Sequence, residues 1–219
     1  GDRDVKIKIK AVGICGSDIH YYQHGSIGDF VVKNPLILGH EASGIVLEVG
    51  REVDTLKPGD RVCMEPGIPG PESEMTRMGN YNLDPGVRFW ATPPIHGCTR
   101  EIVVHPAHLT YKLPDNVSFL EGSLVEPTAI GVYALKKAQI DPGDKVLIIG
   151  AGTIGMVTAL SANISGASRI IISDIKQEKL TKISEMGPYK TVNSTRDDLS
   201  EVVQEVTDGK GVDILFETS

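Results

Sequence analysis

Three residues with side chains that bind metals well stand in two short motifs of the first half of the chain. Cys15 lies in the run 13–20, and His40 and Glu41 stand together directly before a stretch with strand-like alternation. Singly, each has an ordinary explanation, a buried thiol or a satisfied polar group. Together, a thiolate, an imidazole and a carboxylate are ligands that zinc takes in a site with an open position. They predict such a site, with Glu126 as a further carboxylate candidate.

A second motif, in the later half of the chain, is typical of dinucleotide binding. The apolar run 145–149 leads into GAGTIG at 150–155, the pattern G-x-G-x-x-G at the start of an expected helix. The first glycine permits a tight turn, the second lets the backbone approach a pyrophosphate, and the third allows close packing of helix on strand. The helix N-terminus then offers free N–H groups to the phosphates.

The next apolar run ends in Asp174, where an acid can accept hydrogen bonds from the ribose hydroxyls of adenosine. A 2′-phosphate would face this carboxylate, and no arginine follows it directly, so NAD is favoured over NADP. The candidate cofactor-binding residues are Gly150, Gly152, Thr153, Ile154, Gly155 and Asp174.

The elements that must position these motifs have two different periods. In residues 1 to about 115, short runs alternate apolar and polar residues, as in 5–10, and are separated by turns such as 57–60. We expect a barrel-like β domain there, with the Pro- and Gly-rich stretch 65–94 as an ordered functional or structural loop.

From Ser118 onward, the pattern is that of an α/β domain. Ser118 and Glu121 form a capping-box pattern that starts a helix, which Pro127 would bend. Strand-like runs then alternate with helical ones, which predicts a parallel sheet with right-handed crossovers. The fold class is therefore a β-rich domain, 1–117, followed by a doubly wound α/β domain, 118–219.

Composition excludes several classes of protein. The 219 residues carry a net charge of −7 and no cluster of Lys or Arg, which argues against binding to nucleic acid or an anionic membrane. No apolar run approaches the roughly 18 residues of a membrane span, and we expect no signal peptide. The three widely spaced cysteines imply no disulfide framework. We expect a soluble, cytoplasmic protein.

The motifs in combination resemble the zinc-dependent medium-chain dehydrogenase/reductase superfamily, and within it the polyol branch of sorbitol and xylitol dehydrogenases. The signature is GHExxG followed by a glycine at position 50. The stretches that match are 13–22, 39–50, 59–62, 79–83, 89–94, 113–116 and 126–127. The resemblance implies a GroES-like β domain followed by a Rossmann domain.

The resemblance also implies roles for individual residues. It places catalytic zinc on Cys15, His40 and Glu41, with Glu126 at a second acidic position that ligates directly or through water. It makes Ser17 and His20 proton-relay residues, and these two and Glu126 are the catalytic candidates. Asp18 would hold the His40 imidazole, which fixes the tautomer of a ligand. These further catalytic and supporting candidates are Ser17, Asp18, His20 and Glu126.

Two departures from the family matter. Many members bind a structural zinc through four cysteines, but 65–85 contains no cysteine, so we expect one catalytic zinc and no structural one. Members of the polyol branch include some without that zinc. Cys63 and Cys98 are then ordinary small apolar residues. The second departure is length, because only about four strands of a six-stranded dinucleotide sheet are visible. We therefore expect a fragment that lacks both ends, is inactive by itself, and comes from a homo-oligomer.

The predicted activity is reversible, NAD-linked oxidation of a polyol to a ketose by hydride transfer. Two alternatives stay open. One is a zinc alcohol dehydrogenase with another substrate range. The other is a non-catalytic nucleotide-binding or structural protein, against which the four metal-ligand candidates argue because a structural role needs none of them.

Overall fold

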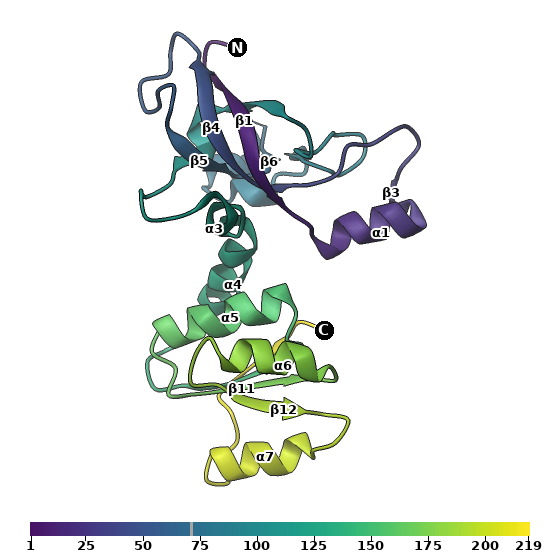
Figure 1. The fold of residues 1–219 in the computed structure, drawn as a ribbon, viewed down its shortest axis with the longest axis vertical. Coiled ribbons are helices and arrows are strands. Elements are labelled where there is room, and N and C mark those ends of the chain that lie inside the picture. The colour runs from purple at the N-terminus through teal and green to yellow at the C-terminus, as the bar shows by residue number, and fades with distance from the viewer. Residues whose placement is uncertain (71) are drawn as a thin grey trace. The chain divides into compact units, whose positions relative to one another are not determined.

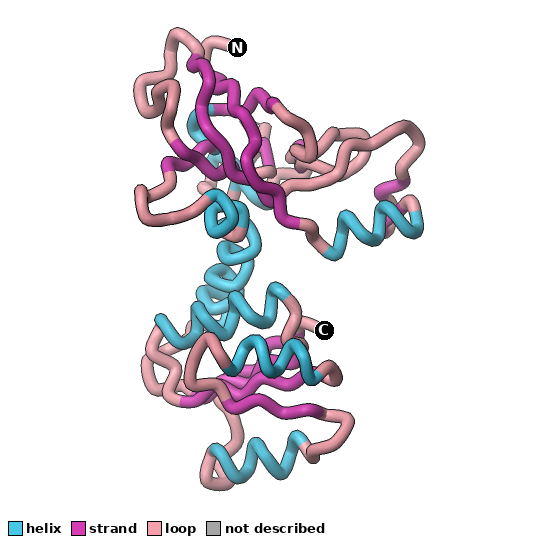
Figure 2. Tube along the Cα trace, viewed as in Figure 1, coloured by secondary structure: helices cyan, strands magenta, loops and turns pink. Residues whose placement is uncertain are grey.

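The computed structural model describes residues 1–70 and 72–219. The chain divides into two compact units, Gly1–Glu126 and Pro127–Ser219. Each is shown in Figures 1 and 2. In the described part of the chain, no helix has both the length and the apolar character needed to cross a bilayer.

The first unit is built on a five-stranded antiparallel sheet with the order β8-β1-β4-β5-β9. Its strands are β1 (Asp4–Gly13), β4 (Glu41–Val49), β5 (Arg61–Met64), β8 (Ile102–Pro106) and β9 (Thr110–Lys112). Val5 and Ile7 of β1 are fully buried, whereas Lys6 between them and Lys8 after them are not, so the alternation seen in the sequence marks the two faces of this strand. The β-rich prediction for this half of the chain is confirmed.

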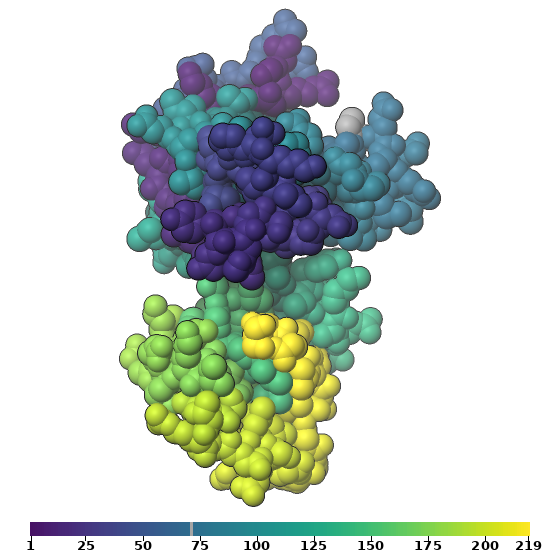
Figure 3. All heavy atoms as spheres, turned by 90° about the vertical axis from the view of Figure 1, so that its right-hand side faces the viewer, coloured from purple at the N-terminus to yellow at the C-terminus, as the bar shows by residue number. Residues whose placement is uncertain are grey.

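Smaller elements surround this sheet. The short strands are β2 (Ser26–Ile27), β3 (Phe30–Val31), β6 (Gly67–Ile68) and β7 (Arg88–Phe89). The helices are α1 (Gly16–His24), α2 (Glu74–Arg77) and α3 (Phe119–Ser123), with 3₁₀ turns η1 (Tyr81–Leu83) and η2 (Ala107–Leu109). Helix α1 and the segment after it, dark purple in Figure 3, lie on the surface of this unit.

The second unit is a parallel sheet with the order β12-β11-β10-β13, as the alternating pattern predicts. Its strands are β10 (Lys145–Ile149), β11 (Arg169–Asp174), β12 (Lys190–Asn193) and β13 (Ile214–Glu217). Its helices are α4 (Val125–Ala138), which begins two residues before the unit boundary, α5 (Thr153–Ile164), α6 (Gln177–Ser184) and α7 (Leu199–Val206).

Apolar side chains cover both faces of this sheet. Ile148 and Ile172 pack in one core with residues of α5 and α6, whereas Leu147 and Ile171 pack in another with residues of α7. This is why β10 and β11 are continuous apolar runs rather than alternating ones. In Figure 2, α7 lies on the opposite side of the sheet from α5 and α6.

The helix expected from Ser118 is two helices. Its capping box is present, because the Ser118 and Glu121 side chains each accept the other's backbone N–H, at 3.2 and 2.7 Å. The helix ends at Leu124, before Pro127, which sits in the first turn of α4, where its missing N–H has no intrahelical partner to lose. Because α3 packs against β1 and β4, it belongs to the first unit.

Candidate metal centre and nucleotide-binding turn

The three metal-ligand candidates meet where β1 ends and β4 begins. Strands β1 and β4 are antiparallel, with Gly13 opposite Glu41, so Cys15 comes to lie beside His40 and Glu41. One ligand atom from each of the three side chains lies within 4.8 Å of the other two. His40 and Glu41 are 6% and 5% exposed, and Cys15 is half-buried at the start of α1.

A residue that the motif analysis did not single out makes this arrangement possible. A Cβ built on Gly13 would overlap the carboxylate of Glu41. Gly13 is therefore required by close approach, because any side chain there would push the Glu41 carboxylate away from Cys15 and His40. The pairing of β1 with β4 could have pointed to Gly13, because a glycine directly opposite a buried acid on a neighbouring strand indicates a space that the acid fills.

Asp18 lies behind the cluster, 5% exposed, and holds the backbone of the ligand segments. Its Oδ2 accepts the N–H of Cys15 at 3.0 Å, and its Oδ1 accepts the N–H of Gly39 at 2.8 Å. The expected hydrogen bond to the His40 imidazole is not formed, because Nδ1 lies 4.0 Å from Oδ1. Asp18 thus ties the two loops that carry Cys15 and His40 to each other through their main chains.

The electrostatics of the cluster suit a bound cation. Contact with the His40 imidazole lowers the pKa of the Cys15 thiol, which favours the thiolate, the form that binds metals. Burial raises the pKa of Glu41 and of Glu126, and the charge of Glu41 raises that of Glu126 further. No Lys or Arg in the described ranges forms an ion pair with Glu41, so a divalent ion fits this set of thiolate, imidazole and carboxylate. Glu126 lies outside the group of three but within electrostatic range of His40.

The substitution Asp18→Asn tests whether this carboxylate organises the cluster. The amide keeps the shape but replaces one acceptor oxygen with a donor, so one of the two backbone N–H groups loses its partner. We expect zinc affinity, measured by competition with a chelator, to fall about 10–100-fold. Asp115→Asn changes an exposed acid of the same unit and should leave the affinity unchanged. Equal affinities for the two variants would show that Asp18 plays no part in metal binding.

A cavity of about 260 Å³ opens beside His40. Its lining includes Ser17 and Tyr21 of α1, Phe89 of β7 and Thr92, and the Tyr21 hydroxyl contacts Thr92. The structure thus places Ser17 next to the metal candidates. His20 is exposed on α1, with its ring 5.6 Å from that of His24, and does not line the cavity.

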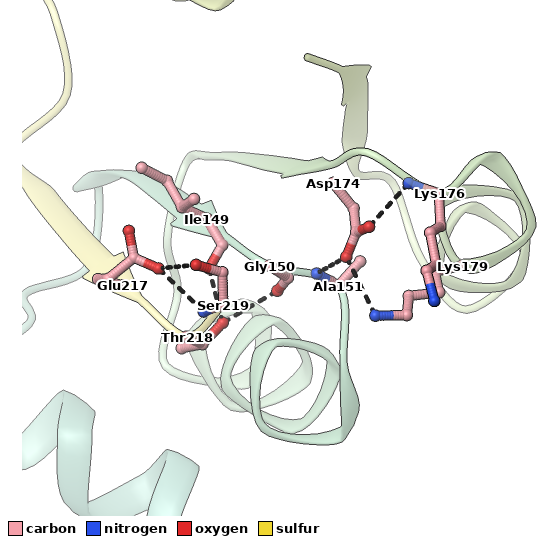
Figure 4. Close-up of polar contacts among 9 residues, drawn as sticks. All are labelled: Ile149, Gly150, Ala151, Asp174, Lys176, Lys179, Glu217, Thr218 and Ser219. Carbon is pink, nitrogen blue, oxygen red and sulfur yellow. Dashed lines mark hydrogen bonds and ion pairs between the residues drawn. The ribbon is translucent and has the colours of Figure 1, made fainter. Parts of the chain in front are cut away.

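The nucleotide motif forms a tight turn between β10 and α5. Gly150 has φ +97°, a conformation that side chains disfavour, and a Cβ on Gly155 would overlap the Gly150 carbonyl. Gly152, by contrast, borders open space. Thr218, at the end of β13, donates its hydroxyl to the carbonyls of Ile149 and Gly150 at 2.8 and 2.9 Å (Figure 4). The turn therefore lies at the carboxyl ends of β10 and β13, where the strand order reverses.

Asp174 ends β11 beside this turn. Its Oδ2 accepts the N–H of Ala151 and its Oδ1 that of Lys176, both at 2.8 Å. Burial would raise the pKa of Asp174, but these two hydrogen bonds and the charge of Lys179 hold it below its ordinary value. A cavity of about 720 Å³ adjoins the turn and is lined by Gly152, Thr153 and Lys179, among others.

Comparison with protein families supports both halves of this description. Residues 1–115, more than half of the chain, match the alcohol dehydrogenase GroES-like domain. The chain belongs to this dehydrogenase family. Residues 153–219 match a second model of the same enzymes, the zinc-binding dehydrogenase.

Individual dehydrogenases of this family are similar over most of the chain. D-xylulose reductase of Morganella morganii is 58% identical over 220 residues, 100% of this chain and 65% of the relative. Sorbitol dehydrogenase of Mus musculus is 47% identical over 94% of this chain and 58% of its own length. A zinc-binding dehydrogenase of Sinorhizobium meliloti, solved with NADP, has a TM-score of 0.87 at 30% identity, over 100% of this chain and 63% of that one. The chain thus spans less than two thirds of these dehydrogenases.

Hydrogen bonds organise the loop 65–85, which contains no cysteine. Tyr81 and Tyr111 both donate their hydroxyls to Glu65 Oε2, at 3.2 and 3.0 Å. Asp84, 4% exposed, accepts the N–H groups of Gly70 and Gly86. Glu65 therefore ties the loop to β9 through Tyr111, and Asp84 accepts N–H groups of the loop itself.

The other two thiols of the chain do not belong to the group of three metal candidates. Cys63 and Cys98 are buried free thiols, and burial raises the pKa of Cys98 to about 12. At neutral pH such a thiol is protonated and unreactive, which agrees with their interpretation as small apolar residues.

Proposed function

We propose that this chain forms the catalytic and nucleotide-binding parts of a zinc- and NAD-dependent polyol dehydrogenase. The observation that carries the proposal is the convergence of Cys15, His40 and Glu41 at the edge of a cavity lined by hydroxyl and aromatic side chains. The names of two similar proteins, D-xylulose reductase and sorbitol dehydrogenase, support polyols and ketoses as the substrate class.

One catalytic zinc would be held by Cys15, His40 and Glu41, with Glu126 joining directly or through water. When bound, zinc supplies Lewis acidity, which makes an alcohol hydroxyl easier to deprotonate. The residues of the chain position the metal ligands. Gly13 leaves room for the Glu41 carboxylate, and Asp18 holds the two ligand loops. The absence of cysteine from 65–85 supports one catalytic zinc and no second, structural zinc.

Ser17 is proposed to take the proton of the substrate hydroxyl, because its side chain lines the cavity beside His40. His20 follows three positions later on α1, so the two side chains share one face of the helix. Ser17 would release its own hydroxyl proton to His20 as it accepts that of the substrate, and the exposed imidazole would pass a proton on to water. Ser17 acts on the substrate and His20 acts as the outlet of the relay.

Recognition of a polyol is assigned to the remaining wall of the cavity. Tyr21 and Thr92 offer hydroxyls, which can exchange hydrogen bonds with the neighbouring hydroxyl groups of a polyol. Phe89 supplies an apolar face against the carbon chain. A simple alcohol would leave these two hydroxyls bonded only to each other, whereas a polyol can use their remaining hydrogen-bonding capacity.

The nucleotide would lie along the turn 150–155, with its pyrophosphate at Gly152, Thr153 and Ile154 and its adenosine ribose at Asp174. Support comes from the open space at Gly152 and from the position of the turn at the reversal of strand order. The charged, largely buried carboxylate of Asp174 favours NAD, because it would repel the 2′-phosphate of NADP.

A substrate panel with the full-length protein tests this function. We expect kcat/KM for xylitol and sorbitol with NAD to exceed that for ethanol and 2-propanol by about 10²-fold or more, since buried hydroxyls discriminate against ligands that leave them unpaired. Thr92→Val, which removes one hydroxyl at constant shape, should reduce the polyol rate and leave the ethanol rate unchanged. Faster turnover of the simple alcohols would contradict the polyol assignment.

A further inference from the structure

The side chain of Arg61, in β5, binds the segment that leads into α3. Its Nη1 donates to the Asp115 carbonyl at 3.0 Å, its Nη2 donates to the Val117 carbonyl, and its Cζ lies 4.7 Å from the centroid of the Phe119 ring. The main-chain carbonyl of Arg61 also accepts the N–H of Leu113 at 2.8 Å. One residue of β5 therefore contacts this segment from its beginning to the first residue of the helix.

These contacts fix the shape of the segment rather than balance a buried charge. Within the described residues, the guanidinium of Arg61 forms no ion pair with a carboxylate. Asp115 is exposed and Val117 is partly exposed, so water would bond both carbonyls if the guanidinium were absent. A guanidinium offers two donors in a fixed plane and a flat face for a ring, which an ammonium lacks. The arrangement therefore uses the geometry of arginine.

Helix α3 lies on the face of the sheet that carries a metal-ligand candidate. It packs against β1, β4 and β5. On β4, Glu41 and Ser43 are two positions apart, so their side chains project from the same face. The Ser43 hydroxyl donates to the Phe119 carbonyl at 2.5 Å, and a Cβ built on Gly122 would lie 3.1 Å from the Cβ of Ser43. Helix α3 is therefore held directly on the face of β4 from which the Glu41 carboxylate projects.

The position of α3 in turn decides where Glu126 lies. The helix ends at Leu124, and Glu126 follows two residues later in the first turn of α4. Leu124 and Val125 are 44% and 42% exposed, so burial of their own side chains does not fix the residues just before Glu126. The Glu126 carboxylate is nevertheless within electrostatic range of His40 and Glu41. Its place near the metal candidates therefore depends on how α3 is held.

We propose that Arg61 is a positioning residue of the metal centre: by fixing the segment before α3, it sets the position of the Glu126 carboxylate relative to His40. The proposal rests on the proposed function, in which Glu126 joins zinc directly or through water. Arg61 acts through α3 rather than on the metal itself. Loss of its guanidinium is therefore expected to weaken zinc binding by displacing Glu126.

A double-mutant cycle on the full-length protein tests this role, with zinc affinity measured by competition with a chelator. We expect the affinity to fall about tenfold in Arg61→Met and about 10–100-fold in Glu126→Gln. Because Arg61 acts through Glu126, adding Arg61→Met to Glu126→Gln should change the affinity by less than about twofold. A role in stability alone would lower the affinity by the same factor in both backgrounds, and that result would overturn the proposal.

Two further variants separate geometry from charge and from surface effects. Arg51→Met is the matched control, because Arg51 pairs with Asp2 on the surface of the same unit, and it should bind zinc like wild type. Arg61→Lys keeps the charge and the apolar stem, so it tests the role of the guanidinium even if Arg61→Met does not fold. It should show most of the same loss, because an ammonium lacks the two-donor plane. Wild-type affinity in Arg61→Lys would overturn the proposal.

Failure of this proposal is distinguishable from failure of the proposed function. If Glu126→Gln weakens zinc binding and Arg61→Met does not, the proposed metal centre stands and only the role of Arg61 is wrong. Unchanged affinity in Glu126→Gln would overturn both the place of Glu126 in the centre and the role of Arg61.

Discussion

The Cys15→Ser variant is expected to contain no zinc and, in the full-length protein, to turn over polyols at least about 10³-fold more slowly than wild type. Serine cannot supply the thiolate that contact with His40 stabilises. Two ligands, an imidazole and a buried carboxylate, would then remain of the group of three. His40→Ala should have the same effect. Mass spectrometry of metal content should find about one zinc per chain in wild type, because the loop at 65–85 has no thiolate for a second.

Nucleotide binding provides the internal control. The turn at 150–155 belongs to the other unit, so both variants should bind NAD within about twofold of wild type, which is within ordinary surface effects. Cys63→Ala removes a buried thiol that is not part of the cluster and should keep the zinc. If both variants lost NAD binding, the separation into a metal site and a nucleotide site would be wrong. A folded wild-type chain without zinc would remove the basis for metal-assisted chemistry.

Acid should destabilise the first unit by about 3 kcal/mol between pH 7 and pH 4 through a single histidine. His105 of β8 is 0% exposed, and burial lowers its pKa to about 4. The folded state keeps the imidazole neutral, whereas the unfolded state takes up a proton near its ordinary pKa of 6.5. The stabilisation is therefore complete above about pH 6.5 and is lost as the pH falls toward 4.

The local structure explains why the folded state resists this proton. His105 Nε2 lies 2.9 Å from the Glu65 carbonyl, its ring packs 4.6 Å from Trp90, and within the described residues its Nδ1 has no partner. A charged imidazole would bury a cation beside an indole with one N–H unpaired. Asp4 is near enough to favour the charge slightly, but burial outweighs it.

Urea unfolding followed by the fluorescence of Trp90, the single tryptophan, measures this effect at several pH values. His105→Gln keeps a donor for the Glu65 carbonyl and does not titrate. Between pH 7 and pH 4 its unfolding free energy should therefore fall by about 3 kcal/mol less than that of wild type. His108→Gln changes an exposed neighbour and should follow wild type. Parallel curves for His105→Gln and wild type would show that His105 does not carry the acid sensitivity.

Much of the architecture was predictable because local periods decide it. The apolar residues of β1 face one side of a sheet, and those of β10 and β11 are buried on both sides. An alternating pattern therefore marks the first unit, and continuous apolar runs mark the second. The turn at Gly150 was also predictable, because a positive φ and close helix packing demand glycine whatever surrounds them. The boundaries of helices were less predictable. The helix that begins after Ser118 ends at Leu124, before Pro127, where the sequence predicts a bend.

The sequence by itself determined which side chains could form the metal cluster and that an acid follows the second strand of the dinucleotide motif. Only the tertiary structure decided what supports them. The register between β1 and β4 makes Gly13 the space for the Glu41 carboxylate. The Asp18 carboxylate accepts the main-chain N–H groups of Cys15 and of Gly39, which lies 21 residues further along the chain than Asp18, and does not bond the His40 imidazole. The three donors on Asp174 likewise come from two segments, the turn at Ala151 and the start of α6 at Lys176 and Lys179. Such contacts depend on distances between residues far apart in the chain, which no local pattern encodes.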